Sequence, residues 1–408
     1  MQFDVFFSVS RTPAFGQFPD EPTMLRNFLA EVEAADALDY GVAWLAESHL
    51  SSEVQKRHVG AVVPHWKGEV GLNVDFVQAA TRLFSRTRRI EAGSAIMNIV
   101  ANGGPVAAAE RVAALMAWHG LDPKEQRRVH VGFAAGRFDF MNRASGIIPR
   151  NAVEAAAWPI VKGLVFREAA DVFCRLLRGD TLASVDLPPP SLSRELFRSD
   201  ADWAAVRDVA GTDEITLDRR WNFDVLKIVP EDWRRELLQL VIGSHEPAQQ
   251  VRVNEILPVQ VFNLSITRPD LIEATHDRMS LAYHPAGGPW RRSYMPRTVM
   301  VFLDGTAGLS DHDRRQRARD HASEALGAYW KALEGTLDPA KVAQAADNAV
   351  IGTPDDVAEQ ICTRFHPDDR LMLWFDFFDH DVDRVIRAMT TFHADVVPRV
   401  RERLGASR

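Results

Sequence analysis

The chain reads Ile90-Glu91-Ala92-Gly93-Ser94-Ala95-Ile96, continues through a helical pattern over residues 105–119, and reaches Val129-His130-Val131-Gly132-Phe133. The first and last of these segments are short apolar runs that favour buried strands, while the middle segment is alanine-rich and long enough for a helix. A strand, a helix and a second strand in this order predict two parallel strands joined by a crossover helix.

The same alternation extends in both directions along the chain. We predict eight strands, each followed by a helix, at residues 3–8, 41–45, 90–96, 129–133, 259–264, 298–303, 348–352 and 371–375. Eight such units in one chain predict a (β/α)₈ TIM barrel with large loop insertions, formed as a single domain over residues 1–408. The largest insertion spans about residues 181–255, where we expect a short strand at 221–229 and a helix at 230–242. Because barrel active sites are built from the loops that follow the strands, this insertion is a candidate lid.

Composition excludes several classes of protein. The chain has 408 residues and a formal net charge of −8, which disfavours nucleic-acid binding. Its 2 cysteines make neither a disulfide framework nor a zinc cluster. No apolar run reaches the roughly 18 residues of a membrane helix, so we expect a cytoplasmic protein without a membrane partner. The acidic run between residues 376 and 383 suits a helix N-terminus better than a metal site, so no metal is expected.

Four segments resemble the bacterial luciferase-like family of flavin-dependent monooxygenases. The first is Trp44-Leu45-Ala46-Glu47-Ser48-His49-Leu50, which is similar to the family's W-L-x-E-H-H-F. The second consists of residues 93–96, where the family has G-[ST]-A, together with residues 105–112, where it has H-P-x-x-x-A-E. The third is residues 350–357, where the family has V-G-T-P-E-x-V. The fourth is residues 392–398, where the family has F-x-x-x-V-x-P. Each match is weak alone, but the four occur in the family's order and span nearly the whole chain.

The resemblance implies a catalytic group at Glu47, Ser48 and His49. Ser48 stands where luciferase has the first histidine of a pair, and serine cannot replace imidazole as an acid–base near neutral pH. His49 matches the second histidine and has either a proton-transfer role or a structural one. Glu47 matches the family's glutamate, and a carboxylate beside a histidine fixes its tautomer.

The resemblance also implies where the flavin lies. The ring is expected against Ser94, Ala95 and Ile96, a segment that often contains a cis peptide bond in the family, with Asn98 at the ring edge. The phosphate is expected after the fifth strand, on Ser265, Thr267 and Arg268, because a helix N-terminus with hydroxyl and guanidinium donors suits an anion. A helix cap with a surface arginine is the alternative there. After the fourth strand, Ala135 replaces luciferase's arginine; Gly136 permits close approach and Arg137 is a substitute cation.

The function implied is a monooxygenase that uses reduced FMN (FMNH₂) and O₂ to oxygenate a small organic substrate through a flavin C4a-(hydro)peroxide. A separate flavin reductase and a second copy of the chain are the expected partners, the homodimer forming through the helix over residues 106–117. One alternative is a deazaflavin-dependent hydride-transfer oxidoreductase of the same fold, with Arg291, Arg292 and Arg297 as additional basic groups. The other is a flavin-binding protein without catalytic activity.

Overall fold

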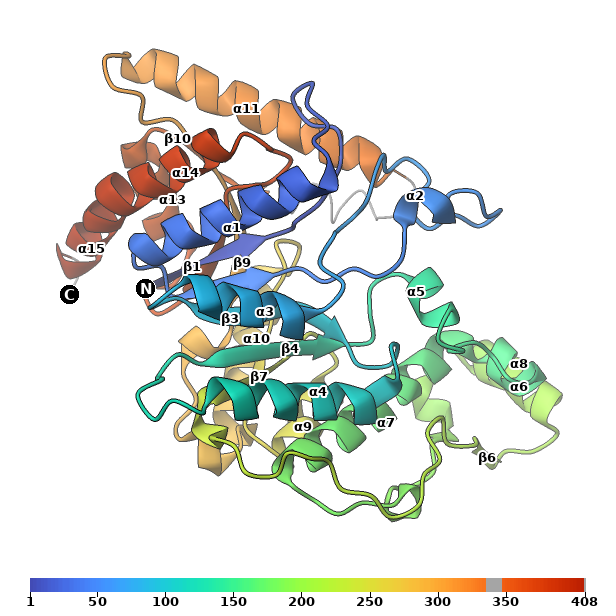
Figure 1. Cartoon of the computed structure of the whole chain (residues 1–408). Helices are drawn as coiled ribbons and strands as arrows, with labels where there is room; N and C mark the ends of the chain where they lie inside the picture. Colours follow the sequence, from blue (N-terminus) through green and yellow to red (C-terminus); the bar gives the residue numbers. More distant parts are fainter. Residues whose placement is uncertain (335–346, 407–408) are drawn as a thin grey trace.

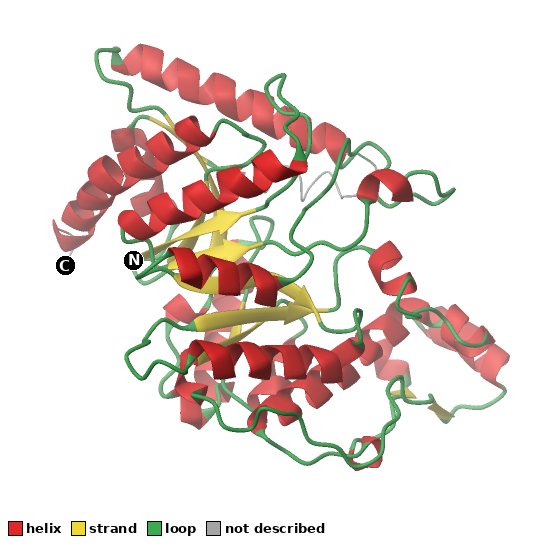
Figure 2. Ribbon diagram, viewed as in Figure 1, coloured by secondary structure: helices red, strands yellow, loops and turns green. Residues whose placement is uncertain are grey.

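The computed structural model describes residues 1–334 and 347–406. Within them, strands at the centre of the molecule are surrounded by helices, and the two chain termini lie on the same side (Figures 1 and 2). The main strands are β1 (Gln2–Phe7), β2 (Val42–Leu45), β3 (Glu91–Asn98), β4 (Val129–Ala134), β7 (Leu238–Ile242), β8 (Val259–Val261), β9 (Arg297–Leu303), β10 (Val350–Gly352) and β11 (Arg370–Trp374). All eight predicted strands are present, and every pairing among the main strands is parallel.

The sheet order is β10-β9-β11-β1-β2-β3-β4-β7-β8. A parallel bridge between Asn263, just after β8, and Arg297 of β9 links the sheet back to its other side. The first half of β9 pairs with β11, and its last residues, Val301–Leu303, pair with β10. The fold is therefore the predicted α/β barrel, with β10 added at the outer half of β9.

The helices pack around this sheet. The larger ones are α1 (Glu21–Ala37), α3 (Phe76–Arg86), α4 (Gly104–His119), α7 (Trp158–Arg178), α9 (Pro247–Asn254), α10 (Pro269–Ala282), α11 (Asp311–Ala332), α13 (Pro354–Arg364), α14 (Val382–Thr391) and α15 (Val397–Ala406). Other elements are α8 (Asp200–Ala210), the short helices α2 (Ser52–Gln55), α5 (Asp139–Arg143) and α6 (Ala152–Ala156), and a small sheet formed by β5 (Ser191–Leu192) and β6 (Ile215–Thr216). Of the helices in the described ranges, none combines the length and the apolar character needed to cross a bilayer.

The region of residues 181–255 differs from its prediction. Residues 238–242 form β7, a central strand between β4 and β8, and not the end of a helix. Residues 221–229 form no strand, although Leu226 makes one isolated bridge with Leu182. Because β7 and α9 belong to the barrel, the segment outside it spans residues 181–237. Within this segment α8 lies beside α6 (Figure 1), and the Trp221 indole lies against Gly104 at the start of α4.

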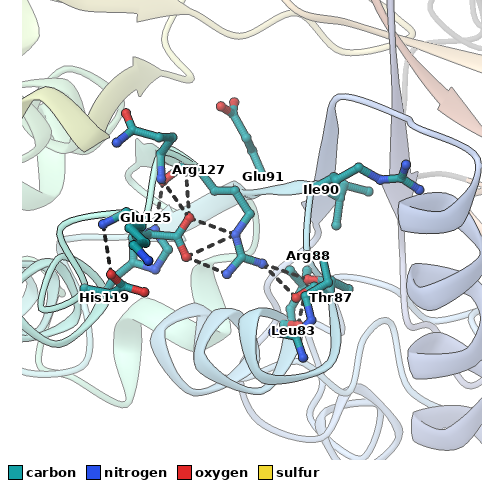
Figure 3. Close-up of polar contacts among 12 residues, drawn as sticks. Leu83, Thr87, Arg88, Ile90, Glu91, His119, Glu125 and Arg127 are labelled. Carbon is teal, nitrogen blue, oxygen red and sulfur yellow. Dashed lines mark hydrogen bonds and ion pairs between the residues drawn. The ribbon is translucent and has the colours of Figure 1, made fainter.

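Polar contacts hold the N-terminal edge of the barrel. The Asp4 carboxylate is fully buried and accepts hydrogen bonds from Trp44 Nε1 (2.7 Å) and from Arg370 Nε (2.6 Å). Nearby, Arg127 pairs with Glu125 (Nε–Oε1 2.9 Å) and donates to the Thr87 carbonyl (3.1 Å), as Figure 3 shows. This edge is the stabilising end of a barrel, and the loops at the opposite edge are free to build a site.

Candidate active site

Glu47 and His49 lie just beyond the C-terminal end of β2. The Glu47 side chain is 2% exposed, and its Oε2 accepts the Phe76 N–H at 3.0 Å. Its Oε1 accepts the Asn98 N–H at 3.2 Å and lies 3.1 Å from His49 Nε2. Because a carboxylate can only accept from a neutral imidazole, this contact fixes the proton of neutral His49 on Nε2. The predicted Glu47–His49 contact is therefore present.

Two asparagines complete the Glu47–His49 network: Asn98, the last residue of β3, and Asn102, which follows it. The side-chain nitrogen of Asn102 lies 3.0 Å from both ring nitrogens of His49, so Nδ1 is the acceptor that faces it. Asn98 donates from Nδ2 to Asn142 Oδ1 at 2.7 Å, and its own Oδ1 accepts the Val100 N–H at 3.1 Å. Ser48 is buried beside them, with its N–H on the Asn73 carbonyl (2.9 Å). Sequence reasoning missed Asn102 and Asn142, because loop residues without a motif give no signal of a contact.

Small residues occupy the C-terminal ends of β3, β4 and β7, which are neighbours in the sheet. At β3 these are Ser94 and Ala95, and the Ala95–Ile96 peptide bond is cis, at the segment where the resemblance implies such a bond. A Cβ on Gly136 (φ +79°) would lie 2.3 Å from Asn98 Nδ2, and one on Gly243 would lie 2.4 Å from Ile96 Cδ1. The positive φ of Gly136 disfavours any other residue there, while a side chain at Gly243 would require Ile96 to move. The Ser94 hydroxyl is fully buried without a hydrogen-bond partner. A flat ring suits this floor, so the residues present fit a flavin.

The loop predicted to hold the phosphate follows a different strand from the one expected. Residues 264–268 come after β8, which is the sixth strand of the barrel, because β7 is the fifth. After β7 come Gly243, Ser244 and His245, followed by the N-terminus of α9. The two loops meet, since Thr267 Oγ1 lies 3.3 Å from His245 Nε2. Burial, together with Arg278, lowers the pKa of His245, which is therefore neutral at pH 7.

The predicted cations occupy different environments. Arg137 is exposed after β4, with its guanidinium 5.2 Å from the Phe138 ring centre. Arg268 is exposed and pairs with Asp270 (Nε–Oδ1 2.9 Å), while Ser265 lies half-buried in the same loop.

The suggestion that Arg291, Arg292 and Arg297 assist a cofactor is wrong. They lie before or at the start of β9, at the opposite end of the barrel. Arg292 pairs there with Asp369 (2.5 Å), and Arg297 is buried against Phe365.

An aromatic cluster lies beside the ends of the strands. It is built by the loops that follow β2, β4 and β11 together with β9 and α11, and we call it the mouth cluster: Trp66, Phe138, Phe302, Tyr329, Phe377 and Phe378. Trp374, the last residue of β11, packs on Phe377 with ring centres 4.7 Å apart. The cluster supplies the apolar surroundings that a water-sensitive reaction needs.

The acidic run after β11 is engaged by protein groups. Asp381 caps α14 by accepting the Arg384 N–H, and Asp379 accepts two hydrogen bonds from the Arg384 guanidinium (2.6 Å each). In the ranges that the structure describes, no three His, Cys, Asp or Glu side chains are grouped so as to hold a metal ion.

No protein-family model and no curated protein matches this chain. Several solved structures do match it. Monooxygenase RslO1 from Streptomyces bottropensis is 17% identical with a TM-score of 0.65, over 98% of this chain and 99% of that one. The FMN complex of the oxygenating constituent of 3,6-diketocamphane monooxygenase, from the CAM plasmid of Pseudomonas putida, is 12% identical with a TM-score of 0.58 and the same coverage.

An F420-dependent secondary alcohol dehydrogenase is also similar, at 14% identity and a TM-score of 0.54, over 98% of this chain and 99% of that chain. Likeness at these identities establishes the fold and leaves the chemistry to the site. This chain therefore shares its fold with these solved structures, in agreement with the fold that the motif resemblance implied.

Proposed function

We propose that this chain is an oxidoreductase that binds reduced FMN and uses O₂ to oxygenate a small organic substrate. The observation that carries the proposal is the Glu47–His49–Asn102 network, which lies at the ends of β2 and β3 beside a floor of small residues. Bound there, reduced flavin supplies the electrons that activate O₂. The chain's own task is to hold the ring, exclude water and place a proton donor or acceptor.

His49 is the proton-transfer group in this proposal. Glu47 holds its Nε2–H, and the Asn102 amide faces Nδ1, the ring nitrogen that takes up a proton. Protonated imidazole has donors on both nitrogens, so the Glu47 carboxylate stabilises the charged ring. Ser48, which replaces the family's first histidine, offers a hydroxyl donor and no acid–base group.

The flavin phosphate has its best partners where the loops after β7 and β8 meet. Ser244 and Thr267 offer hydroxyl donors, and His245 offers a ring nitrogen between them. Arg137, exposed after β4, supplies the charge that Ala135 lacks. Ser265 and Arg268 stay in the proposal as neighbours of Thr267, and phosphate binding would compete with the Arg268–Asp270 pair.

The proposal includes a flavin reductase as a separate protein and a homodimer. The exposed Trp118 at the end of α4 (77% exposed) is the surface on which we expect the second copy to pack. Residues 181–237 remain our candidate for a lid, because their residues Arg220 and Trp221 line a cavity with Gly103 and Gly104, beyond the end of β3.

The test is an anaerobic titration of the full chain with reduced FMN, followed by mixing with O₂. We expect micromolar or tighter binding and an absorbance transient that free reduced FMN does not show. The variant His49→Ala should bind reduced FMN normally and lose the transient or the oxygenated product. Absence of binding would refute the proposal.

Hydride transfer with a deazaflavin is the second candidate, because one similar structure is an F420-dependent dehydrogenase. Its longer anionic tail needs basic groups, and the three arginines suggested for that role lie at the other end of the barrel. The same titration with reduced deazaflavin separates the two: saturable binding and oxygen-independent turnover would favour it over FMN.

A further inference from the structure

A cavity of about 850 Å³ lies beside the mouth cluster. The loop after β1, the loop after β2 and the C-terminal end of α11 surround it. Its floor is apolar and includes Phe378 of the mouth cluster, Ala332 of α11 and Phe18, which is 48% exposed. The volume lies within the range of small-molecule sites, and Phe378 is common to the cavity and the mouth cluster.

The rim of this cavity is basic. Arg11, Lys56, Lys67 and Lys331 line it, together with His65. The chain has only seven lysines against 41 arginines, and three of the seven are here. Lys67 and Lys331 are exposed, and no described residue pairs with either of them.

Two acidic residues share the cavity, and both are already engaged. Glu69 accepts hydrogen bonds from the Ser51 hydroxyl (2.6 Å) and from the N–H and the hydroxyl of Ser52 (2.7 and 3.1 Å). Glu53 accepts from Lys56 Nζ (2.6 Å) and from the Gly68 N–H (2.7 Å). With Glu53 and Glu69 counted against Arg11 and the three lysines, a net positive charge remains at the rim.

We propose that this cavity binds an organic anion with an apolar, aromatic body and thereby selects the substrate of the proposed oxygenation. The body lies on Phe18 and Phe378, and a carboxylate meets Lys67 and Lys331. The assignment as substrate rests on the proposed function, whereas the binding itself does not. A carboxylate near two unpaired ammonium groups gains Coulomb attraction that a neutral group of the same shape does not.

The test compares 2-naphthoate with 2-naphthamide, which differ in charge and little in shape. Calorimetric titration of the full chain at low salt should show at least tenfold tighter binding of 2-naphthoate. The double variant Lys67→Gln/Lys331→Gln should lose that preference and bind 2-naphthamide within twofold of the unaltered chain. The matched control Lys124→Gln, an exposed lysine before β4, should behave as the unaltered chain.

Equal binding of the two probes, no binding of either, or an equal loss in the control variant would overturn the proposal. The reduced-FMN titration of the same proteins separates this inference from the proposed function. If reduced FMN binds and reacts while 2-naphthoate is not preferred, only the substrate inference fails. If 2-naphthoate is preferred while reduced FMN does not bind, only the flavin function fails.

Discussion

Replacing Asp376 by asparagine should remove a pH dependence from the stability of this protein. Asp376 follows β11, and its Oδ2 faces the Ser8 N–H (3.3 Å) and hydroxyl (3.4 Å). Its Oδ1 is buried without a hydrogen-bond partner. Glu31 of α1, which is 4% exposed, belongs to the same buried acidic group. Burial raises the pKa of Asp376 to about 7 and raises that of Glu31 as well, so Asp376 is about half protonated at pH 7.

The direction and size of the change in unfolding free energy with pH follow from the difference between the folded and unfolded pKa values of Asp376. The ordinary pKa of the Asp376 carboxyl is 3.8, so the unfolded chain releases this proton at a lower pH than the folded protein. The stability that the proton provides is fully present below pH 3.8 and is lost as the pH rises through about 7. Each pH unit between 5 and 7 costs about 1.4 kcal/mol, so the free energy of unfolding should fall by about 3 kcal/mol between pH 5 and pH 8.

The assay is urea unfolding followed by tryptophan fluorescence at pH 5, 6, 7 and 8. Asp376→Asn keeps an oxygen for Ser8 and removes the titration of Asp376, so about 3 kcal/mol of the fall in stability between pH 5 and pH 8 should disappear, while the part that comes from Glu31, whose pKa burial also raises, should remain. The exposed Asp383→Asn, seven residues further along, is the matched control and should follow the unaltered protein. If the stability of Asp376→Asn falls as steeply as that of the unaltered protein, the reasoning about a raised pKa at the buried Asp376 carboxyl is refuted.

Three further predictions concern other parts of the molecule. Glu47→Gln should lower the oxygenation rate ten- to a hundredfold with little change in reduced-FMN affinity. The reason is that a single amide oxygen cannot accept hydrogen bonds from His49 and from two backbone N–H groups at once. An unchanged rate in stopped-flow measurements would contradict this prediction. Arg127→Gln should lower stability by about 1–2 kcal/mol at pH 7. Arg127 contributes to lowering the pKa of Glu125 to about 2. The difference in stability between the unaltered protein and Arg127→Gln should therefore hold above pH 5 and shrink as the pH falls toward 2 in acid-unfolding curves. Trp118→Glu should convert the expected dimer to a monomer in sedimentation velocity, and an unaltered chain that sediments as a monomer would contradict the dimer.

The sequence predicted the barrel because most of its strands stand alone between turn residues and helices. β7 was not predicted because the sequence around it has the pattern of a helix. Trp233, Leu237, Leu240 and Val241 recur at the spacing of one helical face, and Pro230 suits a first helical turn. Residues 238–242 form a strand because β4 and β8 supply hydrogen-bond partners on both sides, and no local pattern reports those partners.

Missing β7 shifted β8 and β9 by one position and displaced the phosphate prediction with them, whereas β11 keeps its predicted eighth place because β10 lies outside the barrel. Ser244 and His245 were overlooked because they follow a segment interpreted as a helix, and Thr267 was placed after the fifth strand when it follows the sixth. Thr267 nevertheless contacts His245, because the loops after neighbouring parallel strands emerge at the same edge of a sheet. A motif match thus predicts the same edge of a barrel even where the strand count is wrong, since the edge depends on chain direction and not on strand number.

Some candidate site residues were indicated by the sequence and others were not. Glu47, His49 and Asn98 were predictable because each directly follows or ends a strand, and ends of adjacent parallel strands converge. Asn102 and Asn142 reach the network from loops, and their contacts to residues 53 and 44 positions away depend on how loops pack after the barrel has formed. In the proposed function, the strand ends would fix where the reaction occurs and how His49 is held, while the loops would determine which molecule reaches it. If so, the double variant Lys67→Gln/Lys331→Gln should change substrate preference without changing reduced-FMN affinity, whereas Glu47→Gln should lower the oxygenation rate without changing substrate preference.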